Sequence, residues 1–254
     1  MGFPHCPSSP CGFHLGGVFV QNLSPSGDKS GRLASKAMNS AAAVEASGTV
    51  WKTGAMLILA SRSKTRRTLL SNAGLAFDAV PADIDERAVE TELGLDVEPE
   101  TIAGRLAESK AVEVAGRHPR AWVVGADQVL ALDGVLFHKP ESIEAARRQL
   151  DRLRGRTHRL CSGVALARDG KVVWSHVDMA ELAMRDFSAG ERDEVLRLEG
   201  QDALGSAGAY RLEGPSIRLF ETIRGDYFTI LGLPLLPLLA ALRQYAPDSF
   251  EGFT

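Results

Sequence analysis

The first regular hydrophobic pattern along the chain begins at Met56. Four apolar residues follow one another over 56–59, and a continuous run of this length is typical of a buried strand. Small and polar residues follow over 60–65. From Arg66 onward, Leu69, Leu70 and Ala73 fall on one side of a helix, and Gly74 follows as a residue that often ends helices. The stretch 56–70 therefore predicts a strand, a serine-rich turn and a helix, in that order.

The rest of the chain alternates strand-like and helix-like patterns. Strands are predicted over 75–81, 121–126, 157–167, 171–184 and, broken near Gly225, 220–231; helices are predicted over 99–117, 141–153, 188–198 and after Pro234. Asp-Gly pairs at 133–134 and 169–170 predict hairpins, and 82–87 reads as an acidic turn. The strand over 121–126 is expected to end in Asp127 and Gln128. This alternation favours an α/β or α+β domain with a mixed sheet.

Residues 1–55 lack any such pattern. Gly, Pro and Ser are dense there and charges are sparse, which is the composition of a flexible segment. We therefore expect 1–55 to be a disordered extension or a mis-called start, 56–246 to be the domain and 247–254 a C-terminal tail. N-terminal sequencing of protein from the native locus tests this. A chain beginning at residue 1 or 2 would exclude the mis-called start.

Charge and cysteine usage narrow the class of protein. The net charge is −3 over 254 residues, whereas nucleic-acid-binding proteins are usually basic. No run approaches the roughly 18 apolar residues of a membrane span. The cysteines, Cys6, Cys11 and Cys161, are odd in number and give no disulfide framework. We expect a cytoplasmic protein with free thiols, no membrane partner and no nucleic-acid partner.

Charged and hydroxyl-bearing residues that could bind a ligand or act in catalysis occur at the predicted strand ends and in tight loops. They comprise cations, acids and hydroxyls: Arg66, Lys110, Lys139, Glu86, Asp127, Ser61 and Ser63, with Asp226 as a further acid. Cations beside two or more carboxylates suit a phosphate substrate held through a divalent metal, because carboxylate oxygens bind hard cations and cations stabilise phosphate charge. The chain has no G-x-S-x-G elbow, no H-E-x-x-H and no P-loop motif.

Each of these residues also has an ordinary structural explanation. The basic start of the first helix is either solvated or faces a polyanion, since cations there oppose the helix dipole. Lys110 falls in the apolar row of its helix, so it either pairs inside or extends its ammonium to the surface. Asp127 could cap a turn, and Lys139, before Pro140, could be a surface residue. These residues together indicate a phosphate-binding site more strongly than any one of them does alone.

Eight segments occur together in an order that one enzyme family shows. They are LILASRSKTRRTLL at 57–70, DIDER at 83–87, AESKA at 107–111, VVGADQVLALDG at 123–134, HKP at 138–140, LRGRTHRLCSGVAL at 153–166, AGAYRLEG at 207–214 and LFETIRGDYFTILGLPLLPLL at 219–239. On these segments, the chain from Met56 to its last helix resembles the Maf family of nucleoside triphosphate pyrophosphatases. The resemblance implies a Maf/ITPase-like fold, a single domain whose mixed twisted sheet is flanked by helices, with two lobes around a central cleft.

The resemblance also implies an activity and site residues. A homodimeric enzyme would hydrolyse a nucleoside triphosphate to the monophosphate and pyrophosphate, using Mg²⁺ or Mn²⁺. Asp127 would be the catalytic acid/base and would hold the metal with Glu86. The residues implied to bind substrate phosphates are Ser61, Ser63, Arg66, Lys110 and Lys139.

Three positions bear on the nucleobase. The family's pyrimidine branch tends to read SPRR, GADT and a later Gln, whereas this chain has Thr65 in SKTRR, Gln128 in GADQ and Glu213. Gln128 and Glu213 resemble the 7-methyl-GTP branch, but Thr65 stands where that branch usually has a large aromatic. We therefore expect a third or relaxed specificity. Two further hypotheses remain: a non-catalytic nucleotide-binding regulator of cell division, and a phosphatase that releases single phosphates.

Overall fold

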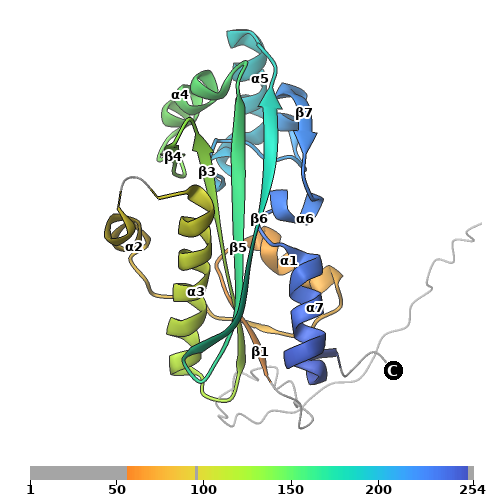
Figure 1. Cartoon of the computed structure of the whole chain (residues 1–254). Helices are drawn as coiled ribbons and strands as arrows, with labels where there is room; N and C mark the ends of the chain where they lie inside the picture. Colours follow the sequence, from red (N-terminus) through yellow and green to blue (C-terminus); the bar gives the residue numbers. More distant parts are fainter. Residues whose placement is uncertain (1–55, 95–96, 251–254) are drawn as a thin grey trace, which may run out of the picture. The chain divides into compact units, whose positions relative to one another are not determined.

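A mixed sheet of seven strands forms the centre of the computed structural model, which describes residues 56–94 and 97–250 (Figure 1). The hypothesis about residues 1–55 lies outside the described residues. The strands are β1 (Leu57–Ala60), β2 (Asp78–Ala79), β3 (Trp122–Leu132), β4 (Val135–Phe137), β5 (Thr157–Arg168), β6 (Lys171–Met184) and β7 (Phe220–Arg224). Their order is β2-β1-β3-β5-β6-β7, with β4 added to β3. Only the β1–β2 and β1–β3 pairs are parallel within this sheet. The predicted mixed sheet is confirmed.

Helices flank the sheet, and short 3₁₀ helices connect some of the elements. They are α1 (Lys64–Asn72), α2 (Glu86–Leu93), α3 (Pro99–Arg117), α4 (Ile143–Leu153), α5 (Ala189–Glu199), α6 (Tyr227–Ile230) and α7 (Leu235–Tyr245), with η1 (Gly200–Gly205), η2 (Pro215–Leu219) and η3 (Pro247–Phe250). Helix α3 has the predicted bounds. The predicted capping box of α5 is also present, with Ser188 accepting from the Glu191 N–H and Glu191 accepting from the Ser188 N–H.

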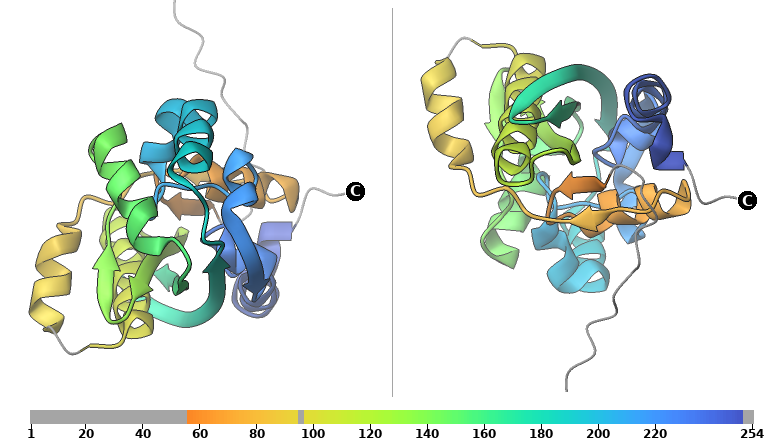
Figure 2. Two further views of the ribbon diagram at one scale, coloured as in Figure 1. Left: turned by 90° about the horizontal axis from the view of Figure 1, so that it is seen from above. Right: turned by 90° about the horizontal axis from the view of Figure 1, so that it is seen from below.

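Alternation along the central strands gives the sheet two apolar faces. Ile58 and Val123 face α3, where they join the small residues of that helix in one cluster. Leu57, Leu59 and their neighbours face α1 and α7 on the opposite side. The ends of the long strands carry a separate cluster under α4 and α5. Figure 1 shows α4 and α5 at one end of β5 and β6, and α3 and α7 nearer the other end. Figure 2 shows α3 and α7 on opposite sides of these strands.

Two glycines allow α3 to lie very close to the sheet. A Cβ at Gly125 in β3 would overlap the Ala107 carbonyl oxygen, and a Cβ at Gly163 in β5 would overlap the Ala103 carbonyl oxygen. Glycine is therefore required here for the close approach of two backbones. This contact fixes the height and rotation of α3 above the strands, and it determines where Lys110 lies.

Three sequence-based expectations about local structure were wrong. The strand at 121–126 does not end at Asp127, because β3 stays paired with β5 from Val123 to Ala131. The residues after Asp85 form α2, in which no residue is fully buried and only Val89 and Leu93, one turn apart, pack partly buried against the core. The segment after Gly225 is helical rather than extended, since Asp226 caps α6 by accepting from the N–H groups of Phe228 and Thr229.

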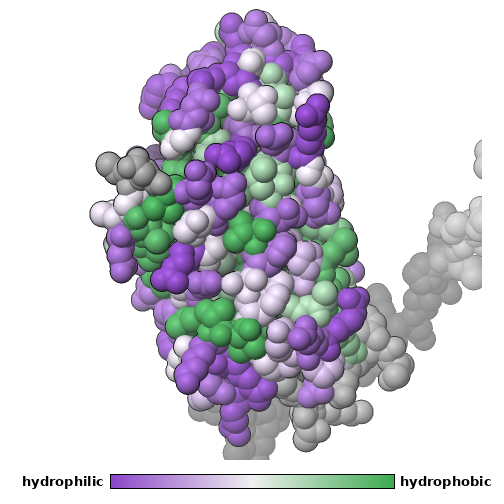
Figure 3. All heavy atoms as spheres, in the orientation of Figure 1, coloured by the Kyte–Doolittle hydropathy of each residue, from purple (hydrophilic) through white to green (hydrophobic). Residues whose placement is uncertain are grey.

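On the face seen in Figure 3, hydrophobic residues form small groups separated by hydrophilic ones. Among the helices that the structure describes, none has the length and apolar character needed to cross a membrane.

Candidate active site

A large cavity opens where the edge of β3 is left unpaired. Strand β1 pairs with β3 as far as Gly125, and β4 pairs with the same edge from Leu130 onward. Residues 126–129 between them are paired only with β5 on the other side. The cavity at this gap has a volume of about 950 Å³, a size typical of small-molecule sites.

Ten of the eleven residues singled out from the sequence line this cavity. They are Ser61, Ser63, Thr65, Arg66, Glu86, Lys110, Asp127, Gln128, Lys139 and Glu213. They come from the β1–α1 turn, α1, α2, α3, β3 and the two loops after β4 and η1. Asp226 is not among the lining residues; it caps α6 instead.

Lys110 joins the two candidate acids. Its ammonium nitrogen lies 2.5 Å from Asp127 Oδ1 and 2.6 Å from Glu86 Oε1. The Lys110 and Asp127 side chains are each only 11% exposed, whereas Glu86 is about half exposed. Lys110 therefore pairs inside the site, and the alternative of an extended surface lysine is excluded. Charge-assisted hydrogen bonds of this kind hold both carboxylates in defined positions.

Glu86 is kept ionised by its surroundings. Burial alone would raise the pKa of Glu86, but the hydrogen bond and charge of Lys110, followed by the charges of Lys139 and Arg66, lower it below its usual value. The cations predicted to bind phosphate therefore already act on a carboxylate of the same cavity.

Arg66 is a structural cation as well as a cavity residue. Its Nε donates to the Gly232 carbonyl oxygen at 2.7 Å, and its Nη1 donates to the Ala126 carbonyl oxygen at 2.7 Å and to Ser61 Oγ at 3.3 Å. Burial lowers the pKa of the guanidinium, although Asp127 and Glu86 oppose this effect. Arg66 thus satisfies a carbonyl on the open edge of β3. Its Nη2 has no acceptor among the described residues.

The serines of the first turn are also oriented by backbone contacts. Ser61 Oγ accepts from the Ser63 N–H at 3.2 Å, and Ser63 caps α1 by accepting from the Arg66 N–H at 3.3 Å. The two hydroxyl groups keep their protons available for a further acceptor. A phosphate oxygen in the cavity would meet this requirement.

The acids fit an open magnesium-type site better than a closed metal cage. Within residues 56–94 and 97–250, no three His, Cys, Asp or Glu side chains are grouped to hold a metal ion. Glu86 and Asp127 nevertheless converge on one cationic nitrogen. Mg²⁺ is commonly bound by one or two carboxylates and completes its shell with waters and substrate phosphates. The pair therefore fits a divalent cation that arrives with a phosphate ligand.

Further cavity residues were not found from the sequence. Glu90 of α2 lies 3.7 Å from His138 Nε2, and both line the cavity. Burial raises the pKa of Glu90, and the Asp127 and Glu86 carboxylates add to this effect while His138 opposes it. The available signals were the capping residue Asp85 ahead of α2 and the apolar pair Val89 and Leu93, which gives this short helix a narrow apolar stripe.

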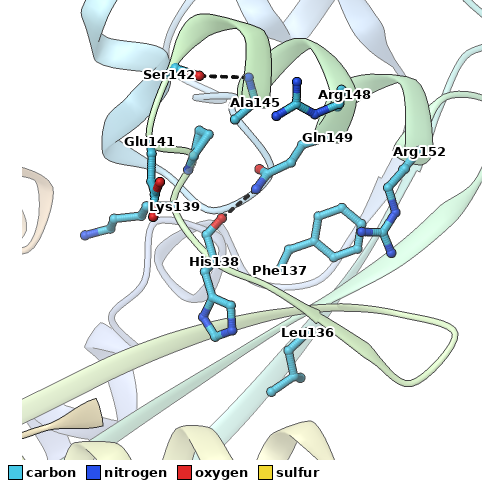
Figure 4. A pocket seen from close by; sticks show the side chains of 11 residues that line it. Leu136, Phe137, His138, Lys139, Glu141, Ser142, Ala145, Arg148, Gln149 and Arg152 are labelled. Carbon is cyan, nitrogen blue, oxygen red and sulfur yellow. Dashed lines mark hydrogen bonds between the residues drawn. The ribbon is translucent and has the colours of Figure 1, made fainter. Parts of the chain in front are cut away.

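A smaller neighbouring cavity of about 350 Å³ shows how the loop that carries Lys139 is held (Figure 4). Gln149 Nε2 donates to the His138 carbonyl oxygen at 2.7 Å, and the Arg152 guanidinium lies 4.3 Å from the centre of the Phe137 ring. In Figure 4 the Lys139 side chain extends away from Gln149 and Arg152. The loop is therefore anchored to α4 while its lysine remains available to the larger cavity.

The wall that carries Glu213 is organised by a buried acid. Glu199, at the end of α5, accepts from the N–H and hydroxyl of Ser216 at 3.0 and 2.7 Å and from Arg211 Nε at 2.8 Å. Arg211 also pairs with Asp202, and both line the cavity. The exposed Glu213 thus lies in a loop whose backbone is fixed on both sides.

Comparisons with known proteins identify the family of this chain. Residues 56–245 match the family described as "Maf-like protein". The "7-methyl-GTP pyrophosphatase" of Brucella abortus biovar 1 (strain 9-941) is 54% identical over 189 residues, which are 74% of this chain and 95% of the relative. The "Nucleoside triphosphate pyrophosphatase" of Nitrobacter winogradskyi is 50% identical over 195 residues, which are 77% of this chain and 96% of the relative. The chain belongs to the Maf family.

Proposed function

We propose that this chain is a nucleoside triphosphate pyrophosphatase that cleaves the bond between the α- and β-phosphates. The observation that carries the proposal is the Glu86–Lys110–Asp127 cluster, which lies in one cavity with Arg66 and Lys139. Relatives at 54% and 50% identity are named as pyrophosphatases. Pure phosphate binding would not require two acids beside the cations, so the non-catalytic regulator is not favoured.

The residues of the cavity have complementary roles in this reaction. Water attacks the α-phosphorus, a new P–O bond forms, and the bond to the bridging oxygen breaks as pyrophosphate leaves with the electron pair. Asp127 takes the proton of the attacking water as general base, a role typically worth about 10²–10⁴ in rate. Lys110, Lys139 and Arg66 neutralise charge on the phosphates, and the Ser61 and Ser63 hydroxyls donate to phosphate oxygens.

A divalent cation, Mg²⁺ or Mn²⁺, is part of the proposal. Glu86 and Asp127 would hold it, and when bound it supplies further neutralisation of phosphate charge. The proposal also includes a cytoplasmic homodimer, as the family resemblance implies.

The substrate proposal concerns the nucleobase. We place Thr65, Gln128 and Glu213 at the positions that select it, and we assign a relaxed preference that includes purines such as positively charged 7-methylguanine. The exposed carboxylate of Glu213 at the cavity wall suits a cationic base. Thr65 offers no aromatic ring on which such a base could stack, so the preference is weaker than an aromatic residue would give.

Product analysis over a panel of nucleoside triphosphates tests the proposal. The protein is incubated with each triphosphate and Mg²⁺ or Mn²⁺, and the products are identified by ion-exchange chromatography. Monophosphate plus pyrophosphate is expected. Diphosphate plus phosphate would instead identify a phosphatase, and binding without any product would identify a regulator. The rates across the panel also give the base preference.

A further inference from the structure

A row of polar residues crosses the three central strands beside the cavity. In the sheet register, Gln128 of β3 is opposite Ser162 of β5, and Ser162 is opposite Asp178 of β6. Residues paired in register point to the same face. This face is therefore interrupted by one polar row, and α6 covers it with Thr229.

The row lies between two apolar clusters. On one side are Ala126 and Val164, which belong to the cluster under α1 and α7. On the other side are Leu130 and Leu160, which belong to the cluster under α4 and α5. Ser162 and Thr229 are fully buried, and burying polar groups is unfavourable unless they are hydrogen-bonded. Apolar residues would continue the core here, so the polar row requires a specific explanation.

Hydrogen bonding fixes the orientation of the Gln128 amide. Its Nε2 donates to the Ile230 carbonyl at 2.9 Å, to the Thr229 carbonyl at 3.1 Å and to Ser162 Oγ at 3.1 Å. The Ser162 hydroxyl donates its only proton to the Thr229 carbonyl at 2.7 Å, so it can act only as an acceptor toward Gln128. Three acceptors thus surround one end of the amide, and only its nitrogen can occupy that end.

Asp178 holds the covering helix in place. The Thr229 hydroxyl donates to Asp178 Oδ2 at 2.8 Å, which ties α6 to β6. The Thr229 carbonyl is the acceptor shared by Gln128 and Ser162. Asp178 therefore acts on Gln128 through Thr229, although Gln128 lies two strands away in the sheet.

The amide oxygen of Gln128 is left for a ligand. It has no donor among the described residues, and the side chain lines the cavity. Gly232 separates it from the guanidinium of Arg66: a Cβ at Gly232 would lie 3.4 Å from Arg66 Nη2 and 3.6 Å from Gln128 Cδ. On the other side the cavity is lined by Leu160, Tyr210 and Ile230. Gln128 thus lies between the cationic part and the apolar part of the cavity.

We propose that Ser162, Thr229 and Asp178 are positioning residues that fix the polarity of Gln128, so that its Oε1 accepts a hydrogen bond from a donor on the nucleoside part of the substrate. The proposal rests on the proposed function, because it assumes that the cationic part of the cavity holds phosphates. The donor is an N–H of the base or an O–H of the ribose. A substrate that lacks this donor leaves the acceptor unpaired and is discriminated against.

Substrate analogues that each lack one donor identify the contact. The comparison is between GTP and analogues without the exocyclic amine (ITP), the N1–H (1-methyl-GTP), the 2′-hydroxyl (dGTP) or the 3′-hydroxyl (3′-deoxy-GTP). For the wild-type protein we expect one analogue to lose about three- to tenfold in kcat/KM, the range of one neutral hydrogen bond. Loss with ITP or 1-methyl-GTP assigns the donor to the base, and loss with a deoxy analogue assigns it to the ribose.

Variants of Asp178 then test the positioning role. Asp178→Ala removes the acceptor that ties the Thr229 hydroxyl to β6 and leaves only the more distant Asp226 Oδ1, at 3.4 Å, in the cap of α6 itself. We therefore expect the discrimination to fall toward unity through a rise in KM for GTP. Asp178→Asn keeps an acceptor oxygen and should restore the discrimination, which a general loss of packing would not explain. Glu181→Gln, an exposed acid on the same strand, is the control and should leave it unchanged. Ser162→Ala gives a second test if Asp178→Ala does not fold.

Different results would overturn the positioning role of the polar row and the proposed pyrophosphatase activity. Equal kcat/KM for GTP and all four analogues, or full discrimination retained in Asp178→Ala and Ser162→Ala, would overturn the role of the row while pyrophosphate release continued. If no triphosphate is hydrolysed, the same ratios are measured as Kd values by calorimetry. Discrimination in binding that is lost in Asp178→Ala would then still support the row.

Discussion

Lys110 Nζ lies 2.5 Å from Asp127 Oδ1 because Gly125, two residues before Asp127, has no side chain. The backbone of α3 occupies the space that a Cβ at Gly125 would need, and the same is true at Gly163 on the next strand. The helix can therefore place a lysine directly over the acid. The ion pair of the site thus depends on a backbone contact that carries no charge.

Replacing either glycine should separate this pair. Gly125→Ala or Gly163→Ala is expected to lower the free energy of unfolding by about 1–3 kcal/mol, as overpacking does, and to reduce pyrophosphate release because Lys110 moves from Asp127. Urea unfolding and a pyrophosphate assay measure the two effects. Gly116→Ala in helix α3 is the control. No atom of the described residues lies within 4 Å of the added Cβ, so we expect the free energy of unfolding to rise by about 0.5–1 kcal/mol. Full activity and stability in both strand variants would contradict the argument.

Asp127→Asn should remove nearly all turnover while the fold survives. The amide cannot accept the proton of the attacking water, and a general base typically contributes about 10²–10⁴ in rate. Pyrophosphate release is measured with saturating substrate, and circular dichroism follows thermal unfolding. Asp78→Asn, at an exposed position of β2 outside the cavity, should behave as wild type. Turnover close to wild type in Asp127→Asn would refute the proposed role.

His158 should make the protein sensitive to acid. It is buried, its Nε2 lies 2.7 Å from the Tyr210 hydroxyl, and its Nδ1 has no hydrogen-bond partner within residues 56–94 and 97–250. Burial lowers the pKa of His158 from 6.5 to about 4. Because the folded pKa is below the unfolded one, stability is full above pH 6.5 and is lost as the pH falls toward 4. This loss amounts to about 2 kcal/mol by pH 5.

Urea unfolding at pH 7 and pH 5 measures this loss. In His158→Gln the side chain does not titrate, so its stability should fall by about 2 kcal/mol less than that of the wild type between these two pH values. An equal fall in both proteins would show that His158 is not the group responsible.

Thr65→Trp should increase the preference for a cationic purine. Thr65 lines the cavity next to Arg66 and is only partly exposed. An indole ring there could stack on 7-methylguanine, and a cation–π contact is worth about 0.5–2 kcal/mol, or roughly two- to thirtyfold in kcat/KM relative to UTP. Steady-state kinetics with 7-methyl-GTP and UTP measure the ratio. Thr65→Val is the size-matched control without stacking; an unchanged ratio in Thr65→Trp would remove Thr65 from the base-selecting positions.

The sequence by itself determined most of the secondary structure and the members of the site. Hydrophobic spacing predicted α3 with its observed bounds and the β5–β6 hairpin to within one residue, because local periodicity and turn residues carry this information. The charged residues at predicted strand ends and loops, read with the family resemblance, also lie around one cavity, apart from Asp226.

Only the tertiary structure decided how these residues are used. Helix α2 has no fully buried side chain, and only Val89 and Leu93 pack partly buried against the core, so its hydrophobic pattern does not show that it brings Glu86 to Lys110. Arg66 binds carbonyl oxygens of Gly232 and Ala126, 166 and 60 residues away. The polarity of Gln128 is set by Ser162, Thr229 and Asp178 from other elements. Such contacts depend on strand register and on the close approach of backbones, which local sequence patterns do not encode.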